Sequence, residues 1–414
     1  MKRGLLAVLS MFTFSCTSSI GDFKDLSSLT EVKKSDKNSF ILKTALNVAK
    51  TLGYKPTTNV DFDFKCNSLT RGVNKGLLLQ AVAIYEKGEK FDFNYFKALL
   101  SATPWIPISM EKKLGQKIVE EEFRRGEFLD RKSHKRLYSI LDKEANIILE
   151  AVKKNFGKRL PYQFHFYIYD STEKNAFSLP GGNIVVSKKL IKELLFEERW
   201  NRHKKGEIST KRRDFLRFTL AHEISHNLKR HHALKLQTLV LNAINDSYQA
   251  RDFMPQYIND IRQILDLKSL IKQSNAKGLK KIESLRDNAE SRIIVFLNLI
   301  NLGLDRLWSN KKHTLEEYSN FEKEADACAL RINSLIYSKS ELEKALENFL
   351  SELPQVSYTS RLDYSSDVSS LASDVANNMR KLIKFYLNQN NCIHPSSFER
   401  ESFLKHLYTE EYKD

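Results

Sequence analysis

The pattern of apolar and polar positions predicts helices over most of the chain and strands in one short region. In residues 137–152 apolar side chains recur every three or four positions, which predicts a long amphipathic helix that ends at Gly157. Residues 40–100 and 241–317 show similar recurrence with few helix-breaking residues, and we expect helices there too. Residues 164–169 are instead rich in aromatic and β-branched side chains, which predicts a strand.

A second strand region surrounds a Pro-Gly-Gly turn at residues 180–182. Strand-like runs precede and follow this turn, at 175–179 and 184–186, so the segment predicts a hairpin. Together with the strand at 164–169 it would form a small sheet just ahead of the next helix. The sequence therefore predicts an α+β fold that is predominantly helical.

The helix predicted next carries a pattern whose spacing dictates a chemistry. Apolar positions recur with helical spacing from Phe215 to Leu228, and within this stretch His222, Glu223 and His226 form H-E-x-x-H. Residues four apart share one face of a helix, so both imidazoles can bind one zinc ion. A zinc-bound water has a pKa of about 7, and the Glu223 carboxylate can take its proton. The alternative is a chance match of five residues on a helix surface.

A third metal ligand is available near residue 322. A catalytic zinc has three protein ligands and one open position. Glu322 and Asp326 are four residues apart and share a helix face, so Glu322 could bind the metal while Asp326 orients a ligand histidine. Taken alone, the pair would be interpreted as a solvated acidic face.

Four segments, in this order, resemble peptidase family M48. They are the run Asn-Ala-Phe-Ser-Leu-Pro-Gly-Gly at 175–182, the H-E-x-x-H helix, E-x-E-A-D at 322–326, and a His-Pro pair whose His394 lies six residues before Arg400. The family includes CAAX prenyl proteases, HtpX-type proteases, and soluble periplasmic and mitochondrial quality-control proteases. The order and span of the segments make the resemblance specific.

The resemblance implies a zincin-like (gluzincin) metallopeptidase domain with a small sheet beside its active-site helix. One catalytic Zn²⁺ is implied, with Glu223 as the general base that activates water. The remaining implied roles are zinc ligation by His222, His226 and Glu322, orientation of a ligand histidine by Asp326, donation to the oxyanion by His394 with Arg400 in support, and pairing with an extended substrate by Asn175, Ala176, Phe177, Ser178 and Leu179.

The chain departs from the family pattern in three places. Relatives often have glycine where this chain has Ser225, and a small residue there still lets helices approach. They often carry Ser-Arg where this chain has Tyr318 and Ser319, which puts one contact around the metal ligands in doubt. The stretch between the second and third ligands is also long, and we expect a helical insertion at about 242–317.

The first residues predict export. A basic start is followed by a mostly apolar run to Phe14 and then by Ser15 and Cys16, which is typical of a lipoprotein signal peptide with lipidation at Cys16. Thr13 departs from the usual leucine, so secretion after plain cleavage is the alternative. We therefore divide the chain into a signal peptide at 1–16, a tether and helical region at 17–105, and the peptidase domain at 106–414.

Charge and cysteines narrow the possibilities further. The net charge of +16 is spread along the chain and favours a solvated lysine-rich surface, with contact to anionic lipid as the alternative. No nucleic-acid recognition pattern is present, so nucleic acid is not an expected partner. Four cysteines without C-x-x-C spacing argue against a thiolate zinc site. Cys328 is expected either as a small buried apolar residue or in a bridge with Cys392.

These features predict a zinc-dependent metalloendopeptidase of the bacterial cell envelope, held to the membrane by a lipid anchor. Its expected substrates are unfolded or misassembled proteins, in protein quality control. A non-catalytic or self-inhibited chaperone or assembly factor that retains the zinc site is the main alternative. A surface adhesin is a third possibility, suggested by location and charge. The apolar run 293–304 contains two asparagines and is expected to form a buried helix.

Overall fold

A computed structural model shows the fold of the chain within residues 55–414. Within it the described residues are 60–74, 77–78, 81, 93–156, 160–193, 210–246, 314–353 and 397–413. The predictions for residues 1–59, including the signal peptide and Cys16, lie outside these residues. So do His394, Cys392 and most of the expected insertion.

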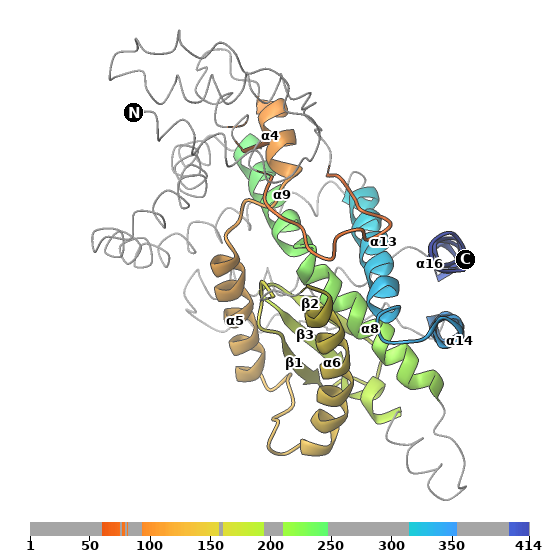
Figure 1. The fold of residues 1–414 in the computed structure, drawn as a ribbon. Helices are drawn as coiled ribbons and strands as arrows, with labels where there is room; N and C mark the ends of the chain where they lie inside the picture. Colours follow the sequence, from red (N-terminus) through yellow and green to blue (C-terminus); the bar gives the residue numbers. More distant parts are fainter. Residues whose placement is uncertain are drawn as a thin grey trace, which may run out of the picture. The chain divides into compact units, whose positions relative to one another are not determined.

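The described residues are mostly helical with one small sheet, which confirms the predicted α+β, predominantly helical class (Figure 1). The long helix predicted at 137–152 is present and ends one residue before Gly157. In chain order the elements are α4 (Phe93–Ser101), α5 (Ile108–Arg124), α6 (Lys135–Phe156), β1 (His165–Tyr169), β2 (Ala176–Leu179), β3 (Asn183–Ser187), α8 (Thr210–Leu228), α9 (His231–Asp246), α13 (Thr314–Asn333), α14 (Lys339–Glu352) and α16 (Ser397–Tyr412).

The sheet has the strand order β1-β3-β2. β1 and β3 run parallel, with His165 opposite Asn183, whereas β2 and β3 form the predicted antiparallel hairpin. Its turn contains Gly181 and Gly182 at φ +80° and +91°, a region where glycine has no steric penalty. β2 is therefore an edge strand of the described sheet.

The β2–β3 turn is fixed between two helices. Gly115 of α5 lies so close to it that a Cβ there would come within 1.9 Å of the Pro180 carbonyl oxygen. Asn183 Nδ2 donates to the same carbonyl at 2.8 Å. From the other side, Asn227 of α8 accepts a hydrogen bond from the Gly182 N–H at 2.9 Å. The turn thus fixes the position of β2 relative to α8.

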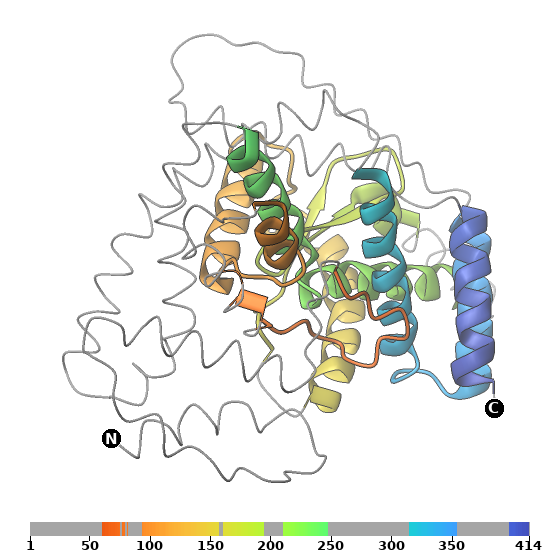
Figure 2. The same ribbon diagram turned by 90° about the horizontal axis from the view of Figure 1, so that it is seen from above.

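α8 is the central helix. Every residue from Leu220 to Leu228 is buried, as expected for a helix covered on all sides. It contacts α6, α13 and α14, and α13 crosses it in Figure 2. Phe215 and Phe218 both stack on Phe349 of α14, with ring centroids 5.5 and 5.0 Å apart. Burial of each such ring stabilises the fold by about 1.5–3 kcal/mol.

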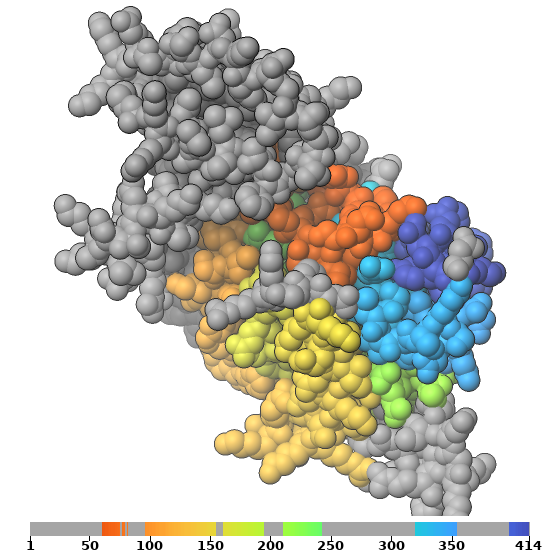
Figure 3. Space-filling view, viewed as in Figure 1, coloured from red at the N-terminus to blue at the C-terminus, as the bar shows by residue number. Residues whose placement is uncertain are grey.

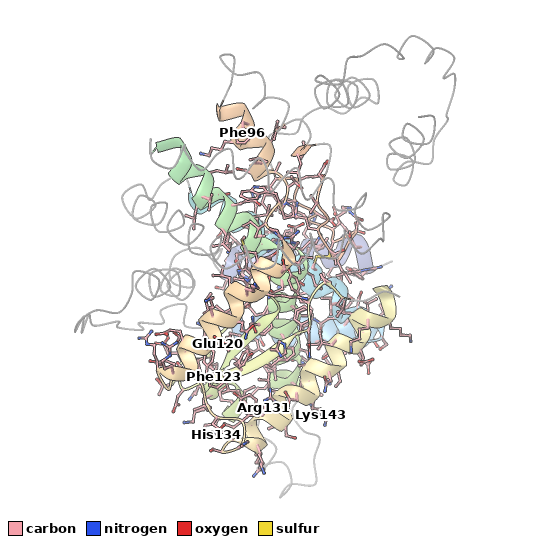
Figure 4. The ribbon with its side chains drawn as sticks, turned by 90° about the vertical axis from the view of Figure 1, so that its left-hand side faces the viewer. Phe96, Glu120, Phe123, Arg131, His134 and Lys143 are labelled. Atoms are coloured by element: carbon pink, nitrogen blue, oxygen red, sulfur yellow. A yellow bond between two sulfur atoms is a disulfide. The ribbon has the colours of Figure 1, made fainter. Side chains whose placement is uncertain are left out.

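α5 and α6 support the sheet from outside the site. Phe123 on α5, labelled in Figure 4, packs edge-on against Tyr167 of β1, with ring centroids 5.7 Å apart. Tyr138 on α6 accepts a hydrogen bond from the Ile168 N–H and donates to the Leu129 carbonyl. These contacts hold β1 in place, so the sheet can present β2 to α8.

Residues 60–74 form an irregular segment with a turn at Cys66, and we call this segment the strap. It lies on the face seen in Figure 3, beside α13 and α16. Cys66 of the strap forms a disulfide with Cys328 of α13. The alternative pairing of Cys328 with Cys392 is therefore wrong, and Cys328 is buried as half of a bridge. The strap's path over α13 brings together two cysteines 262 residues apart, and no sequence spacing indicates that path.

Among the described residues, none of the helices combines the length and the apolar character that crossing a membrane requires. Both ends of the expected insertion lie within helices, in α9 and α13, and residues 247–313 lie outside the described residues. The boundaries predicted for the three regions of the chain stay predictions.

Candidate metal centre

α8 and α13 bring the three predicted zinc ligands together in the core. Nε2 of His222 lies 3.0 Å from Nε2 of His226 and 3.1 Å from Oε2 of Glu322. The same oxygen lies 3.5 Å from Nε2 of His226. All three side chains are buried. The two histidines are one helical turn apart, and the crossing of the helices supplies the carboxylate.

These separations fit a zinc ion. Zn–N and Zn–O bonds of roughly 2.0–2.2 Å with tetrahedral angles place neighbouring ligand atoms about 3.3 Å apart. The observed 3.0–3.5 Å lie on both sides of that value. The set of two imidazoles and one carboxylate is also the donor set of known catalytic zinc sites. The residues present therefore fit the metal that the sequence predicts.

Asp326 and Arg400 hold His222. Oδ1 of Asp326 lies 2.8 Å from Nδ1 of His222, so Nε2 of this imidazole points toward the other ligands. Arg400 donates to both oxygens of Asp326, at 2.8 and 2.5 Å. Arg400 is thus paired with Asp326, and His394, which Arg400 was expected to support, lies outside the described residues.

The charges around His222 set its protonation. Burial opposes a positive imidazolium, but Asp326 and Glu322 outweigh it and raise the pKa of His222 to about 10. Burial would likewise raise the pKa of Asp326, but Arg400 and His222 lower it to about 2. Asp326 is therefore a carboxylate at neutral pH, and a metal ion that binds His222 displaces a proton from it.

Glu223 borders a pocket beside the ligands. Its lining includes Asn175, Ala176, His222, Glu223 and Arg400. Burial raises the pKa of Glu223 to about 7, since the carboxylate is removed from water. A carboxyl group with that pKa can both accept and release a proton near neutral pH.

The predicted substrate strand meets this pocket at one end only. Asn175 and Ala176 line the pocket, whereas the Ser178 hydroxyl oxygen lies 3.0 Å from Nε2 of His232. Phe177 is not among the lining residues and packs on Tyr169 instead, with ring centroids 5.5 Å apart. Leu179 is also buried, in the hydrophobic interior. The side chains of Phe177 and Leu179 thus serve the core, and pairing of the β2 backbone with substrate stays a prediction.

Sequence reasoning missed a second set of buried polar residues behind His226. Nδ1 of His226 lies 2.9 Å from Nδ1 of His231, whose Nε2 lies 2.9 Å from Oε2 of Glu324. His232 follows, and its Nε2 lies 3.0 Å from the Ser178 hydroxyl oxygen. Two signals were available: the adjacent histidines shortly after H-E-x-x-H, and the middle glutamate of E-x-E-A-D.

Burial keeps these imidazoles uncharged. It lowers the pKa of His226 well below its usual value and that of His231 to about 4. Burial also lowers the pKa of the nearby Lys235, although Glu322 and Glu223 oppose the shift. Each ligand histidine also has a partner on Nδ1: Asp326 for His222 and His231 for His226. Such partners orient metal-binding imidazoles in proteins.

One departure from the family pattern, Ser225, is accommodated within α8. Ser225 is fully buried and donates to the Ala221 carbonyl at 2.7 Å, so the helix accommodates it. Tyr318 and Ser319 lie on α13 ahead of Glu322.

The comparison with known proteins gives one match. The model of peptidase family M48 matches residues 141–406, the stretch that contains α8, α13 and most of α16. Neither the curated proteins nor the solved structures include a match. The match covers well over half of the chain and includes all three ligands of the candidate metal centre. The chain therefore belongs to peptidase family M48, a family of metallopeptidases.

Proposed function

We propose that the chain is a zinc-dependent metalloendopeptidase with a zincin-like fold, located in the bacterial cell envelope. The observation that carries the proposal is the convergence of His222, His226 and Glu322 at 3.0–3.5 Å from one another, with Glu223 beside them. Membership of peptidase family M48 supports hydrolysis of peptide bonds. Unfolded or misassembled proteins are the proposed substrates.

The residues of the site divide the reaction among them. Zinc held by the three ligands would polarise the scissile carbonyl and lower the pKa of a water molecule to about 7. Glu223 accepts a proton from the attacking water and returns it to the leaving amine, which its pKa of about 7 allows. Asp326 keeps His222 in the orientation that exposes Nε2. His394 is expected to donate a hydrogen bond to the oxyanion.

The edge strand β2 supports a substrate that binds in extended form. An added strand would hydrogen-bond through its main chain, which requires little of the substrate sequence. Because Asn175 and Ala176 line the pocket that contains Glu223, a peptide paired with this end of β2 would pass the candidate base. Weak sequence preference suits a protease that removes unfolded proteins of many kinds.

The Cys66–Cys328 disulfide supports a location outside the cytosol, because disulfides persist in oxidising compartments. The predicted lipoprotein signal at 1–16 supports attachment to a membrane. Growth of cells with labelled palmitate tests the anchor: we expect label in the wild-type protein and none in the Cys16→Ala variant. Label that persists in the variant contradicts lipidation at Cys16.

Metal analysis and proteolysis together test the enzyme. We expect about one zinc per chain and cleavage of casein that a chelator stops and added zinc restores. Glu223→Gln should keep the zinc and slow cleavage by at least about 100-fold, because the amide cannot accept the proton. Glu150→Gln, on the exposed side of α6, is the matched control and should cleave normally. Undiminished cleavage by Glu223→Gln, or a wild-type chain that binds no zinc, contradicts the proposal.

A further inference from the structure

The strap lies outside residues 141–406, the stretch that resembles other peptidases of the family, yet it reaches the candidate metal centre. It does so by binding Glu324, the middle glutamate of E-x-E-A-D, whose side chain is fully buried. The Asp63 N–H donates to Oε1 of Glu324 at 3.0 Å. Arg71 Nη2 donates to both carboxylate oxygens, at 2.8 and 2.7 Å. Two residues of the strap therefore hold one buried carboxylate of α13.

Glu324 is linked to the metal ligand His226 through hydrogen bonds of His231. A neutral imidazole has one N–H and one acceptor nitrogen. When Nε2 of His226 binds a metal, its Nδ1 carries the proton and donates it to Nδ1 of His231, 2.9 Å away. His231 then has its own proton on Nε2 and donates it to Oε2 of Glu324, at 2.9 Å. Each donor in this series of two hydrogen bonds has an acceptor, so the direction of both hydrogen bonds is fixed.

The strap also balances the charge around the buried Glu324 carboxylate. Lys229 lies 3.2 Å from Glu324 and 3.0 Å from Asp63, and Arg71 lies 2.7 Å from Glu324. The four groups are two carboxylates and two cations. A buried charge is costly unless it is paired and hydrogen-bonded. Asp63 and Arg71 thus supply one charge of each sign. They are also two of the four residues that contact the Glu324 carboxylate, the others being Lys229 and His231.

Three contacts keep the strap in place. Cys66 is joined to Cys328 on α13, four residues after Glu324. Phe62 packs edge-on against Phe321 of the same helix, with ring centroids 5.1 Å apart. The Arg71 N–H donates to the Leu228 carbonyl at 3.2 Å, at the end of the helix that carries both histidines. The strap is therefore fastened to both helices of the site.

We propose that the strap is a working part of the metal centre: through Glu324 and His231 it fixes the orientation of His226. His231 and Glu324 are positioning residues, since they act on the metal through His226. The inference rests on the proposed function, because the orientation of His226 matters only if that residue binds zinc. It adds to the family's site an element that comes from outside the matched region.

Substitutions at His231 test the hydrogen-bond chain in the full-length protein. Asparagine can place a carbonyl oxygen near the position of Nδ1 and so keep an acceptor for His226. Glutamine reaches the position of Nε2 and keeps the contact with Glu324, but it loses that acceptor. We expect His231→Gln to raise the zinc dissociation constant about 10- to 100-fold and His231→Asn to recover part of this loss. His406→Gln, an exposed histidine on α16, is the control.

The zinc dissociation constant is measured by competition with a chromophoric chelator, and the melting temperature of the metal-free protein is measured beside it. If His231 only packs the core, both variants lower the melting temperature and bind zinc like the wild type, which overturns the inference. Equal weakening in the two variants also overturns it, because the acceptor would then be irrelevant. A wild-type chain that binds no zinc instead overturns the proposed function itself.

Two further measurements cover the case in which the His231 variants fail to fold. In the zinc-loaded wild type, long-range ¹H–¹⁵N spectra should show the proton of His231 on Nε2, and a proton on Nδ1 contradicts the proposed direction.

For the strap, Arg71→Gln should weaken zinc binding, while the exposed Arg124→Gln should not. The double variant Cys66→Ser/Cys328→Ser should weaken binding in the same direction, and unchanged affinity in both strap variants removes the strap from the site.

Discussion

Replacement of Gly181 by alanine tests whether the β2–β3 turn is fixed by crowding against α5. A Cβ at this position would lie 2.6 Å from Lys112 Cα and 2.8 Å from the Glu111 carbonyl oxygen. Optimal contacts between carbon atoms are about 3.5–4.0 Å, so the clash amounts to about 1 Å. Both atoms belong to the helix backbone and cannot rotate away. Either the turn or α5 must therefore move.

Gly126→Ala is the matched control. Gly126 has φ +76°, close to the +80° of Gly181, but no atom of the described residues lies within 4 Å of the position that an alanine Cβ would take there. Alanine in this left-handed region costs about 1–2 kcal/mol at either site. Alanine also has less backbone conformational entropy than glycine in the unfolded chain, and this difference is the same at both sites. The difference between the two variants thus isolates the packing clash, for which overpacked cores indicate about 1–3 kcal/mol.

Urea denaturation of the full-length chain, followed by fluorescence, measures both free energies of unfolding. We expect Gly126→Ala to lose about 1–2 kcal/mol and Gly181→Ala to lose about 2–5 kcal/mol. Equal losses in the two variants would refute the reasoning, because crowding against α5 would then contribute nothing. Gly72→Ala should be close to neutral, since no described atom surrounds that position.

Three further outcomes follow from charges in the core. Asp326→Asn should weaken zinc binding about 10- to 100-fold in chelator competition, and wild-type affinity would contradict its role. Arg230 donates to the buried Glu111 carboxylate at 2.9 and 2.5 Å, so Arg230→Met should cost about 3–5 kcal/mol in urea denaturation, and a neutral result would show that the pair is dispensable. Without metal, burial raises the pKa of Glu223 from 4.5 to about 7, so the native state keeps a proton that the unfolded chain has lost and stability falls as the pH rises through this range. Metal-free Glu223→Gln should therefore be up to about 3 kcal/mol more stable than the wild type at pH 8 and equal to it at pH 4, and a pH-independent difference would contradict the shift.

The parts of the site that depend on local spacing could be predicted from the sequence. His222 and His226 are four residues apart on one helix, and this spacing alone places them on one face. Glu322 and Asp326 follow the same rule on α13. That α13 is the helix that supplies the third ligand was inferred from the resemblance to peptidase family M48. No local pattern tells which acidic helix crosses α8.

His231 shows why the rest of the site could not be predicted. On a continuous helix it would lie about 140° around the axis from His226, on a different face. The helix is interrupted, however: α8 ends at Leu228 and α9 begins at His231, with Arg230 at φ +57° between them. The interruption turns His231 back toward His226. A left-handed arginine has no distinctive sequence signal, so periodicity could not reveal the contact.

The position of the strap could not be predicted from the sequence either, for a different reason. Asp63, Cys66 and Arg71 form no pattern of their own, and their partners lie far along the chain. Asp63 accepts hydrogen bonds from the N–H groups of Asn67 and Ser68, both at 2.9 Å, which shapes the turn around Cys66. Even this local signal indicates only a turn. Where that turn docks depends on the whole tertiary arrangement.

The bridge between Cys66 and Cys328 closes a covalent ring that contains all three candidate zinc ligands. A single backbone cut anywhere inside that ring, by the enzyme itself or by another protease, would leave the two pieces attached to each other. Nicked molecules would migrate as one species on a non-reducing gel and separate only after reduction. For a member of a metallopeptidase family, this topology would keep the three candidate ligands covalently joined after one such cut.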